Sequence, residues 1–179
     1  MNHTSNTAAS VTIEPMADVD DAAIASFVTK IPVHDMLFLN RDIREPRVLA
    51  AWRRAVEAGS VQSLVAMADG EVVATSAVVY EPLFWSAHIA EVRLLVRPDW
   101  RGHGIGRALL DAIIGSSFAS GPAKITARMT SDQGGALRLF EKAGFRSEAV
   151  LRGHVRDEGG KPRDLAILSM EIAGDQASR

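Results

Sequence analysis

Residues 101–107 place three glycines at alternate positions between two arginines, directly before an apolar run. Glycine inside a helix or strand costs roughly 0.5 to 1 kcal/mol relative to alanine, so this cluster indicates a turn that needs backbone freedom. A glycine-rich turn that leads into a helix presents unpaired backbone N–H groups at the positive end of the helix dipole. Arg101 and Arg107 add charged donors. The stretch therefore predicts an anion site, and phosphate is the natural ligand.

Two familiar nucleotide-binding motifs do not fit this stretch. A P-loop requires a lysine and then Ser or Thr after its last glycine, whereas Gly106 is followed by an arginine and an alanine. A dinucleotide fingerprint requires the spacing Gly-x-Gly-x-x-Gly, whereas Gly102, Gly104 and Gly106 alternate, and Thr126 stands where the ribose-binding acid is expected. A nucleotide-binding switch is therefore a disfavoured function.

The elements that must position this turn follow from hydrophobic periodicity and turn residues. Asp69-Gly70 between two apolar runs is a strong hairpin signal. Helices are predicted over 18–28 and 47–59, from Ile105 to about residue 121, and from a cap at Ser131-Asp132 to Gly144. Strands are predicted over 11–15, 60–68, 71–81, 88–98, 123–129, 146–157 and 165–172.

This order of elements implies a mixed α/β (α+β) fold. Strand-helix-strand connections over 89–129 imply a parallel pairing, and the hairpins on either side imply antiparallel ones. We expect a mostly antiparallel twisted sheet of about seven strands with about four helices on both faces. A single domain is expected over 11–172, between flexible tails at 1–10 and 173–179.

The composition narrows the function. The chain has 179 residues, of which 47% are hydrophobic, and its net charge of −2 gives no field that would favour nucleic acid. Without cysteine it has no thiolate metal site or cysteine nucleophile, and His88 and His154 lack metal-ligand spacing, so no metal is expected. The first residues lack the apolar core of a signal peptide, and no run is long enough to span a membrane. We therefore expect a cytoplasmic protein that does not bind membranes.

Two motifs carry a resemblance to a known family. VRPDWRGHGIGRALL at 96–110 resembles the pyrophosphate-binding motif of the GNAT acyltransferase superfamily, and ALRLFEKAGF at 136–145 resembles the helix motif that follows it there. The resemblance covers roughly residues 60–172. It implies a GNAT fold that binds acetyl-CoA, with the pantetheine arm along a strand that separates from its neighbour. The implied contacts are Leu94, Leu95 and Val96 for the arm, and Arg101, Gly102, His103, Gly104, Ile105, Gly106 and Arg107 for the diphosphate.

The same resemblance implies transfer of an acetyl group to a primary amine by direct attack on the thioester. A lysine-like amine is almost wholly protonated at pH 7, because its pKa lies roughly 3 units above that pH. Removing its proton costs about 4 to 5 kcal/mol, so a general base is useful. The Ala90-Glu91 pair resembles Pat-type bacterial protein-lysine acetyltransferases and related small-amine acetyltransferases, which implies that Glu91 is a general base, directly or through water. The alternative is an ion pair between Glu91 and a neighbour such as Arg93.

The second motif departs from the family pattern at two positions. Gln133 stands where many members have asparagine, and it is retained as a cofactor contact. Phe140 stands where many have tyrosine, and a phenyl ring cannot protonate the leaving sulfur. We interpret Phe140 as a core residue, and coenzyme A is a fair leaving group as a thiolate because thiols have a pKa near 8.5.

The acceptor substrate is the part of the reaction that the sequence predicts least well. Segment 31–47 is too apolar for a solvated loop and too irregular for a clean helix, and its His34 and Asp35 are weak candidates to recognise an acceptor ammonium. The alternative is an apolar loop under a solvated acidic rim. The acceptor is a small-molecule amine or a protein lysine, and a homodimer is one option for the assembly. A non-catalytic acyl-CoA sensor or interaction module is the alternative function.

Overall fold

The computed structural model describes residues 10–80, 85–117 and 121–172. The two predicted tails, except Ser10, lie outside these residues, as do Glu81 of the third predicted strand and 118–120 of the third predicted helix. The strands are β1 (Thr12–Pro15), β2 (Val61–Ala68), β3 (Glu71–Tyr80), β4 (Ile89–Val96), β5 (Lys124–Thr130), β6 (Arg146–Arg156) and β7 (Pro162–Glu171). The α-helices are α1 (Asp21–Thr29), α2 (Val33–Met36), α3 (Pro46–Glu57), α4 (Ile105–Ser117) and α5 (Gly134–Lys142).

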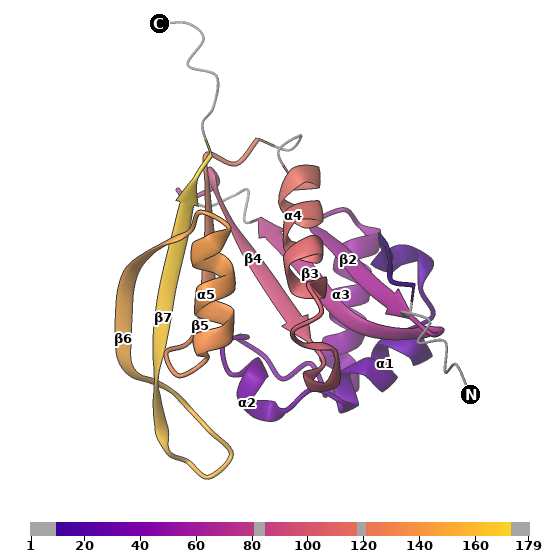
Figure 1. Cartoon of the computed structure of the whole chain (residues 1–179), viewed down its shortest axis with the longest axis horizontal. Helices are drawn as coiled ribbons and strands as arrows, with labels where there is room; N and C mark the ends of the chain where they lie inside the picture. Colours follow the sequence, from indigo (N-terminus) through magenta and orange to yellow (C-terminus); the bar gives the residue numbers. More distant parts are fainter. Residues whose placement is uncertain (1–9, 81–84, 118–120, 173–179) are drawn as a thin grey trace, which may run out of the picture.

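The strands form one sheet in the order β1-β2-β3-β4-β5-β7-β6 (Figure 1). In this sheet β4 and β5 pair in parallel, and every other neighbouring pair is antiparallel. The mixed, mostly antiparallel seven-stranded sheet predicted from the sequence is thereby confirmed. The described residues hold five α-helices instead of about four, because one turn of helix, α2, forms in the segment predicted to be irregular.

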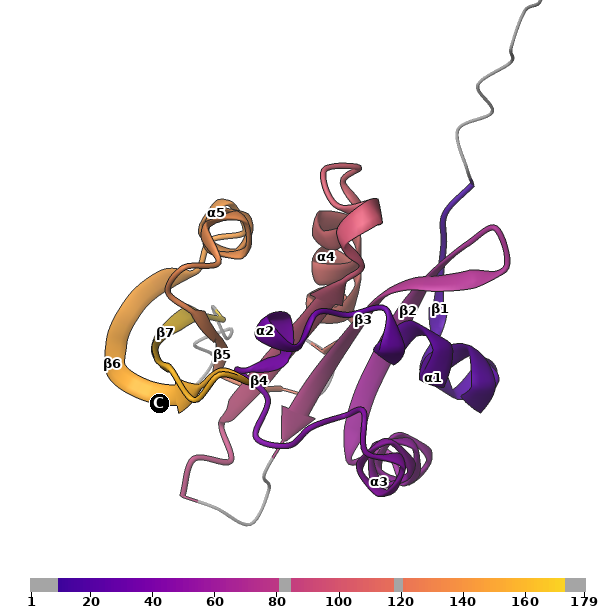
Figure 2. The same ribbon diagram turned by 90° about the horizontal axis from the view of Figure 1, so that it is seen from below.

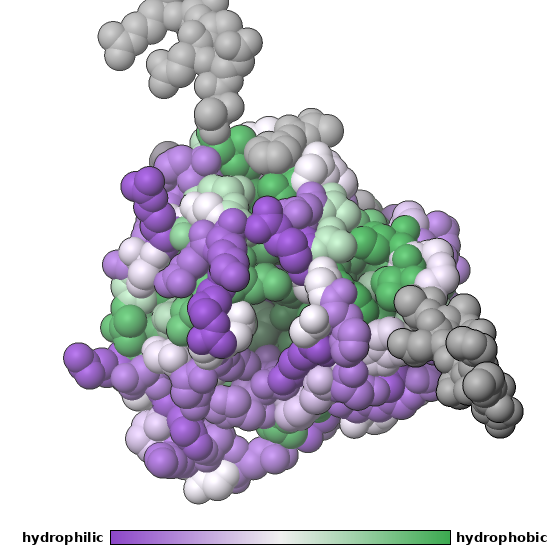
Figure 3. All heavy atoms as spheres, viewed as in Figure 1, coloured by the Kyte–Doolittle hydropathy of each residue, from purple (hydrophilic) through white to green (hydrophobic). Residues whose placement is uncertain are grey.

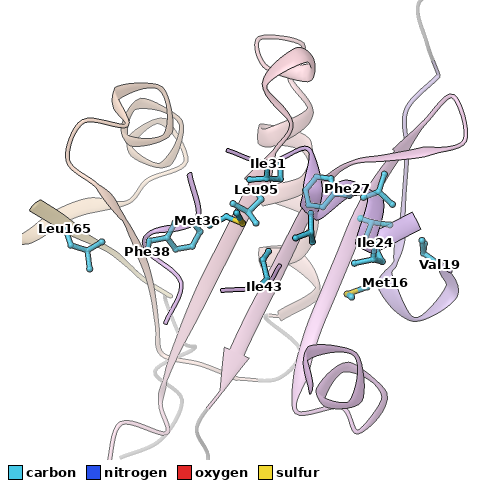
Figure 4. Close-up of a cluster of buried hydrophobic side chains, with 13 residues drawn as sticks. Met16, Val19, Ile24, Phe27, Ile31, Met36, Phe38, Ile43, Leu95 and Leu165 are labelled. Carbon is cyan, nitrogen blue, oxygen red and sulfur yellow. The ribbon is translucent and has the colours of Figure 1, made fainter. Parts of the chain in front are cut away.

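The helices cover both faces of the sheet. Helices α4 and α5 lie on one face, and α1 and α3 lie on the other (Figure 2). The apolar side chains of segment 31–43 join α1 in covering the second face, where Leu95 of β4 lies among Ile31, Met36 and Ile43 (Figure 4). None of the described helices is both long and apolar enough to cross a membrane.

The parallel pair opens part way along its length. Pairing between β4 and β5 runs from Ile89↔Lys124 to Val92↔Ala127, although β4 continues to Val96 and β5 to Thr130. The two strands therefore diverge toward their carboxyl ends (Figure 1). Along Arg93–Val96 the β4 backbone keeps β3 as a partner on one side but has no described strand on the other. This split is the opening around which the candidate site is built.

Candidate active site

The three glycines of the loop serve two structural purposes. Gly102 and Gly104 have φ angles of 81° and 79°, in the left-handed region where a side chain is strained. Gly106 lies in the first turn of α4, and a Cβ there would meet Leu139 Cδ1 at 3.3 Å and Val96 Cγ2 at 3.4 Å. Two glycines thus shape the turn, and the third lets α4 approach β4 and α5 closely.

The turn leaves a run of backbone donors without protein partners. The first hydrogen bond of α4 runs from Ala108 N–H to the Gly104 carbonyl at 3.0 Å. From Gly102 to Arg107, no backbone N–H has an acceptor among the described residues. Such donors at the start of a helix, where the dipole is positive, fit an anion with several oxygens. The residues present therefore fit a diphosphate.

A cavity of about 750 Å³, called the large cavity below, lies over this turn and the split between β4 and β5. In the space-filling view a hollow with apolar residues in it lies between α4 and α5, and hydrophilic residues surround it (Figure 3). Its size is that of a small-molecule or cofactor site. Among its lining residues are the sequence-predicted His34, Asp35, Leu94, Leu95, Val96, Arg101, Gly102, Gly104, Gly106, Arg107 and Gln133.

Arg101 is a predicted diphosphate residue whose side chain binds the Asp35 carboxylate and the Val96 carbonyl, and three more of these residues have side chains engaged elsewhere. Ile105 is 4% exposed in the core between α4 and the sheet, so only its backbone can face a ligand. The His103 ring lies against Trp100, with 6.2 Å between ring centroids. Arg107 forms an ion pair with Asp111 at 2.7 Å and donates to the Lys142 carbonyl, which ties α4 to α5. For these residues the backbone remains the group available to a diphosphate.

Side chains of helix α2 bind residues that follow each of the two diverging strands, β4 and β5. The Asp35 carboxylate accepts from Arg101 of the glycine turn at 2.5 Å and from Gln133, the residue that caps α5, at 3.3 Å. His34 Nε2 lies 2.9 Å from Asp132 Oδ1. His34 and Asp35, predicted as weak acceptor contacts, thus lie at the large cavity beside the predicted cofactor residues Arg101 and Gln133.

Asp132 explains why α5 starts later than predicted. Its carboxylate contacts His34 and, at 3.3 Å, Arg163, and the cap of α5 is Gln133. Partial burial raises the pKa of Asp132, but hydrogen bonds from Thr130 and His34 outweigh burial and hold that pKa below its ordinary value. The predicted cap at Ser131-Asp132 was wrong because this side chain binds across the chain instead of capping the helix.

Glu91 lies between two arginines. Its Oε1 is 2.7 Å from Arg93 Nε, and its Oε2 is 2.6 Å from Arg128 Nη2. The carboxylate is 20% exposed. Arg128 lines the large cavity, and Arg93 lines a second cavity of about 380 Å³ on the α3 face, called the small cavity below. The ion pair with Arg93 that the sequence left as an alternative is therefore present, and Glu91 joins an arginine of the large cavity to an arginine of the small cavity.

Phe140 is a core residue, as the sequence predicted. It is 4% exposed and packs edge-to-face on Phe145, with 5.1 Å between ring centroids. Phe145 follows Gly144, which lies just beyond the end of α5 and has a positive φ of 102°. Phe140 also contributes to the wall of the large cavity, where it offers apolar surface and no proton.

Several lining residues were not predicted from the sequence. Arg138 and Lys142 are one helical turn apart on α5 and bring positive charge to the large cavity. Arg128 was also missed, although alternation along β5 places it on the same face as Thr126, which pairs with Glu91 across the parallel strands. The helical spacing of Arg138 and Lys142 and the strand alternation at Arg128 were the sequence signals that could have predicted these residues. Among the described residues, no group of three His, Asp or Glu side chains could hold a metal ion.

Comparison with known proteins agrees with this architecture. The model of the acetyltransferase (GNAT) family matches residues 28–145, which include β4, the glycine turn, α4 and α5. The chain belongs to this family. The family model thus covers both motifs on which the sequence resemblance rests and the residues that line the large cavity.

The curated relatives include an enzyme that acetylates protein. The [ribosomal protein bS18]-alanine N-acetyltransferase of Escherichia coli (strain K12) is 28% identical over 80 residues. That match covers 45% of this chain and 53% of the relative, so the chain spans about half the length of the curated relatives it matches.

Solved structures share the fold over nearly the whole chain. A ribosomal-protein-alanine N-acetyltransferase from Brucella melitensis has a TM-score of 0.73 at 18% identity, covering 90% of this chain and 99% of that one. A putative acetyltransferase from Salmonella typhimurium, solved with its cofactor acetyl-CoA, has a TM-score of 0.74 at 21% identity, covering 94% of this chain and 96% of that one. A phosphinothricin acetyltransferase from Sinorhizobium meliloti, in complex with acetyl-CoA, has a TM-score of 0.74 at 19% identity, covering 94% of this chain and 92% of that one.

Proposed function

We propose that this protein is an N-acetyltransferase that transfers the acetyl group of acetyl-CoA to a primary amine. The observation that carries the proposal is the run of unpartnered N–H groups from Gly102 to Arg107, which opens onto a cavity at the split between β4 and β5. Membership of the acetyltransferase (GNAT) family and structural likeness to proteins solved with acetyl-CoA support it.

The chain offers a separate place for each part of the cofactor. The turn Gly102–Arg107 would hold the diphosphate through backbone N–H groups, and Arg138 and Lys142 add positive charge near it. The backbone of Arg93–Leu95 would pair with the amide groups of the pantetheine arm, because that edge of β4 has no described strand partner. The next carbonyl, of Val96, already accepts hydrogen bonds from Arg101. Leu94, Leu95 and Val96 line the same space.

Acetyl-CoA supplies an activated acyl group as a thioester. The amine nitrogen forms a bond with the acyl carbon, the carbon–sulfur bond breaks, and its electron pair leaves with the sulfur as a thiolate. The proton lost by the amine passes to Glu91, directly or through water, since this carboxylate is paired with Arg128 of the large cavity and Arg93 of the small cavity. Phe140 cannot protonate the sulfur, and the low pKa of a thiol makes this unnecessary.

Release of free coenzyme A in the presence of acetyl-CoA and a panel of primary amines tests the proposal. Wild-type protein should release coenzyme A only when an acceptor is present. Glu91→Gln should lower turnover by roughly 10²- to 10⁴-fold at neutral pH, and by less at high pH, where more of the amine is already neutral. An unchanged pH profile for this variant would show that Glu91 only holds Arg93 and Arg128 in place.

The sensor alternative makes a different prediction in the same experiment. A non-catalytic module would bind acetyl-CoA but release no coenzyme A with any amine, and Phe140 in place of tyrosine is the feature that favours it. Acetyl transfer to even one amine at a rate that depends on Glu91 would rule this alternative out.

A further inference from the structure

The small cavity differs from the large one in its charge. Its floor is formed by β3 and β4, whose residues Ala77 and Arg93 pair in register, and its opposite wall comes from segment 39–52. Two charged residues line it, Arg41 and Arg93, and both are positive. Within the described part of the chain, Arg41 has no carboxylate partner, and Arg93 makes its one ion pair through Nε, to Glu91. A ligand here therefore meets guanidinium groups that are available to an anion.

Most of the remaining lining of the small cavity is apolar, with Asn40 and Thr75 as its uncharged polar residues. Ile43 and the aromatic Trp52 line it together with further aliphatic side chains, namely Leu39, Val48, Ala51, Val61, Ala77, Val79, Leu94 and Leu95. At about 380 Å³ the cavity has the size of a site for a small molecule. Leu94 and Leu95 line both cavities, so the small cavity and the large cavity are neighbours along β4.

The neighbouring charges match a zwitterion with closely spaced groups. Glu91 is not among the lining residues of the small cavity, but its Oε1 is 2.7 Å from Arg93 Nε, so a carboxylate stands directly beside the guanidinium that does line it. In an α-amino acid a single carbon separates the amine from the carboxylate. A dication such as a polyamine would instead bring its second charge toward two arginines, and like charges repel in such a site.

We propose that the small cavity binds a free α-amino acid with an apolar side chain, which is the acceptor of the acetyl group. Its amine lies at Glu91, its carboxylate at Arg93 with Arg41 adding positive charge, and its side chain on Trp52 and Ile43. This inference rests on the proposed function and narrows its acceptor. It predicts that a free carboxylate is required, which a protein lysine side chain does not provide.

Matched acceptors test the inference. With saturating acetyl-CoA, kcat/KM for coenzyme A release is measured for L-phenylalanine, L-leucine and L-methionine, each beside its amide and its decarboxylated amine. At least one amino acid should exceed its two derivatives by roughly ten-fold or more, because a hydrogen-bonded charge pair is lost in each derivative. Arg41→Gln should lower this ratio toward one, mainly through KM. Arg47→Gln, which changes an exposed arginine outside the cavity lining, should leave the ratio unchanged.

The outcomes separate this inference from the proposed function. If the derivatives are acetylated as fast as the amino acids, the inference is wrong and the proposed function stands. If acetyl-CoA does not bind, both are wrong. If no acceptor in the set is acetylated, titration of the three amino acids into protein saturated with coenzyme A decides. Binding that Arg41→Gln weakens ten-fold supports the inference, and no binding overturns it.

Discussion

Replacing Gly104 by alanine should destabilise the protein and weaken its response to acetyl-CoA. Gly104 has a φ of 79°, and an added Cβ would meet no atom within 4 Å, so the cost comes from the backbone alone. A non-glycine residue in the left-handed region costs about 1 to 2 kcal/mol. For a chain of this length, 1 kcal/mol corresponds to roughly 2 to 4 °C in Tm, so the expected fall is about 2 to 8 °C.

Gly115→Ala is the matched control for Gly104→Ala. Gly115 lies inside α4, the helix that Gly104 immediately precedes, does not have a positive φ, and also has no atom within 4 Å of an added Cβ. Alanine is favoured over glycine in a helix by up to about 1 kcal/mol, so this variant should be as stable as wild type or more so. The two substitutions add the same methyl group, but Gly104→Ala should lower Tm and Gly115→Ala should leave it unchanged or raise it.

Thermal unfolding of both variants with and without acetyl-CoA is the assay. If Gly104→Ala relieves its strain by moving the turn, the N–H groups from Gly102 to Arg107 no longer converge, and acetyl-CoA should raise Tm less than in wild type. A Gly104→Ala variant that melts at or above the wild-type Tm, and whose Tm acetyl-CoA raises as much as that of wild type, would refute this prediction.

Two further predictions concern stability. Phe140→Ala should lower the free energy of unfolding in urea by about 3 to 5 kcal/mol, because it empties a buried site against Phe145; a loss below about 1 kcal/mol would contradict a core role. Hydrogen bonds from Lys30 and then Arg97 lower the pKa of Glu71, and two hydrogen bonds from Arg97 lower the pKa of Asp99. Lowered carboxyl pKa values stabilise the fold above the unfolded-state values, and this contribution is lost as the pH falls through the folded-state values. The stability difference between wild type and Glu71→Gln should therefore stay constant above about pH 5 and shrink below it, and a difference that grows in acid would show the sign to be wrong.

The sheet and the glycine turn could be predicted because their signals are local. Alternation marks the strands, Asp69-Gly70 marks the hairpin, and glycines at alternate positions mark a turn before a helix whether or not the rest of the fold is known. The split between β4 and β5 could be predicted only from the family resemblance, because no residue pattern predicts where the pairing of two parallel strands stops.

The parts that could not be predicted depend on contacts between distant segments. Helix α2 is a single turn held by Asp35, which pairs with Arg101 66 residues further along the chain. Glu91 meets Arg128 only because β4 and β5 pair in one parallel register. The small cavity likewise combines Arg41 with Arg93, which lie on segments far apart in sequence, so its charge could be seen only once the chain was folded.

Isothermal titration of the wild-type protein with acetyl-CoA tests the central claim most directly. Backbone donors from Gly102 to Arg107, together with the cavity at the split strands, predict saturable binding of one acetyl-CoA per chain well below millimolar concentration. Coenzyme A should compete for the same site, because it carries the same diphosphate. The absence of binding up to millimolar acetyl-CoA would contradict the account.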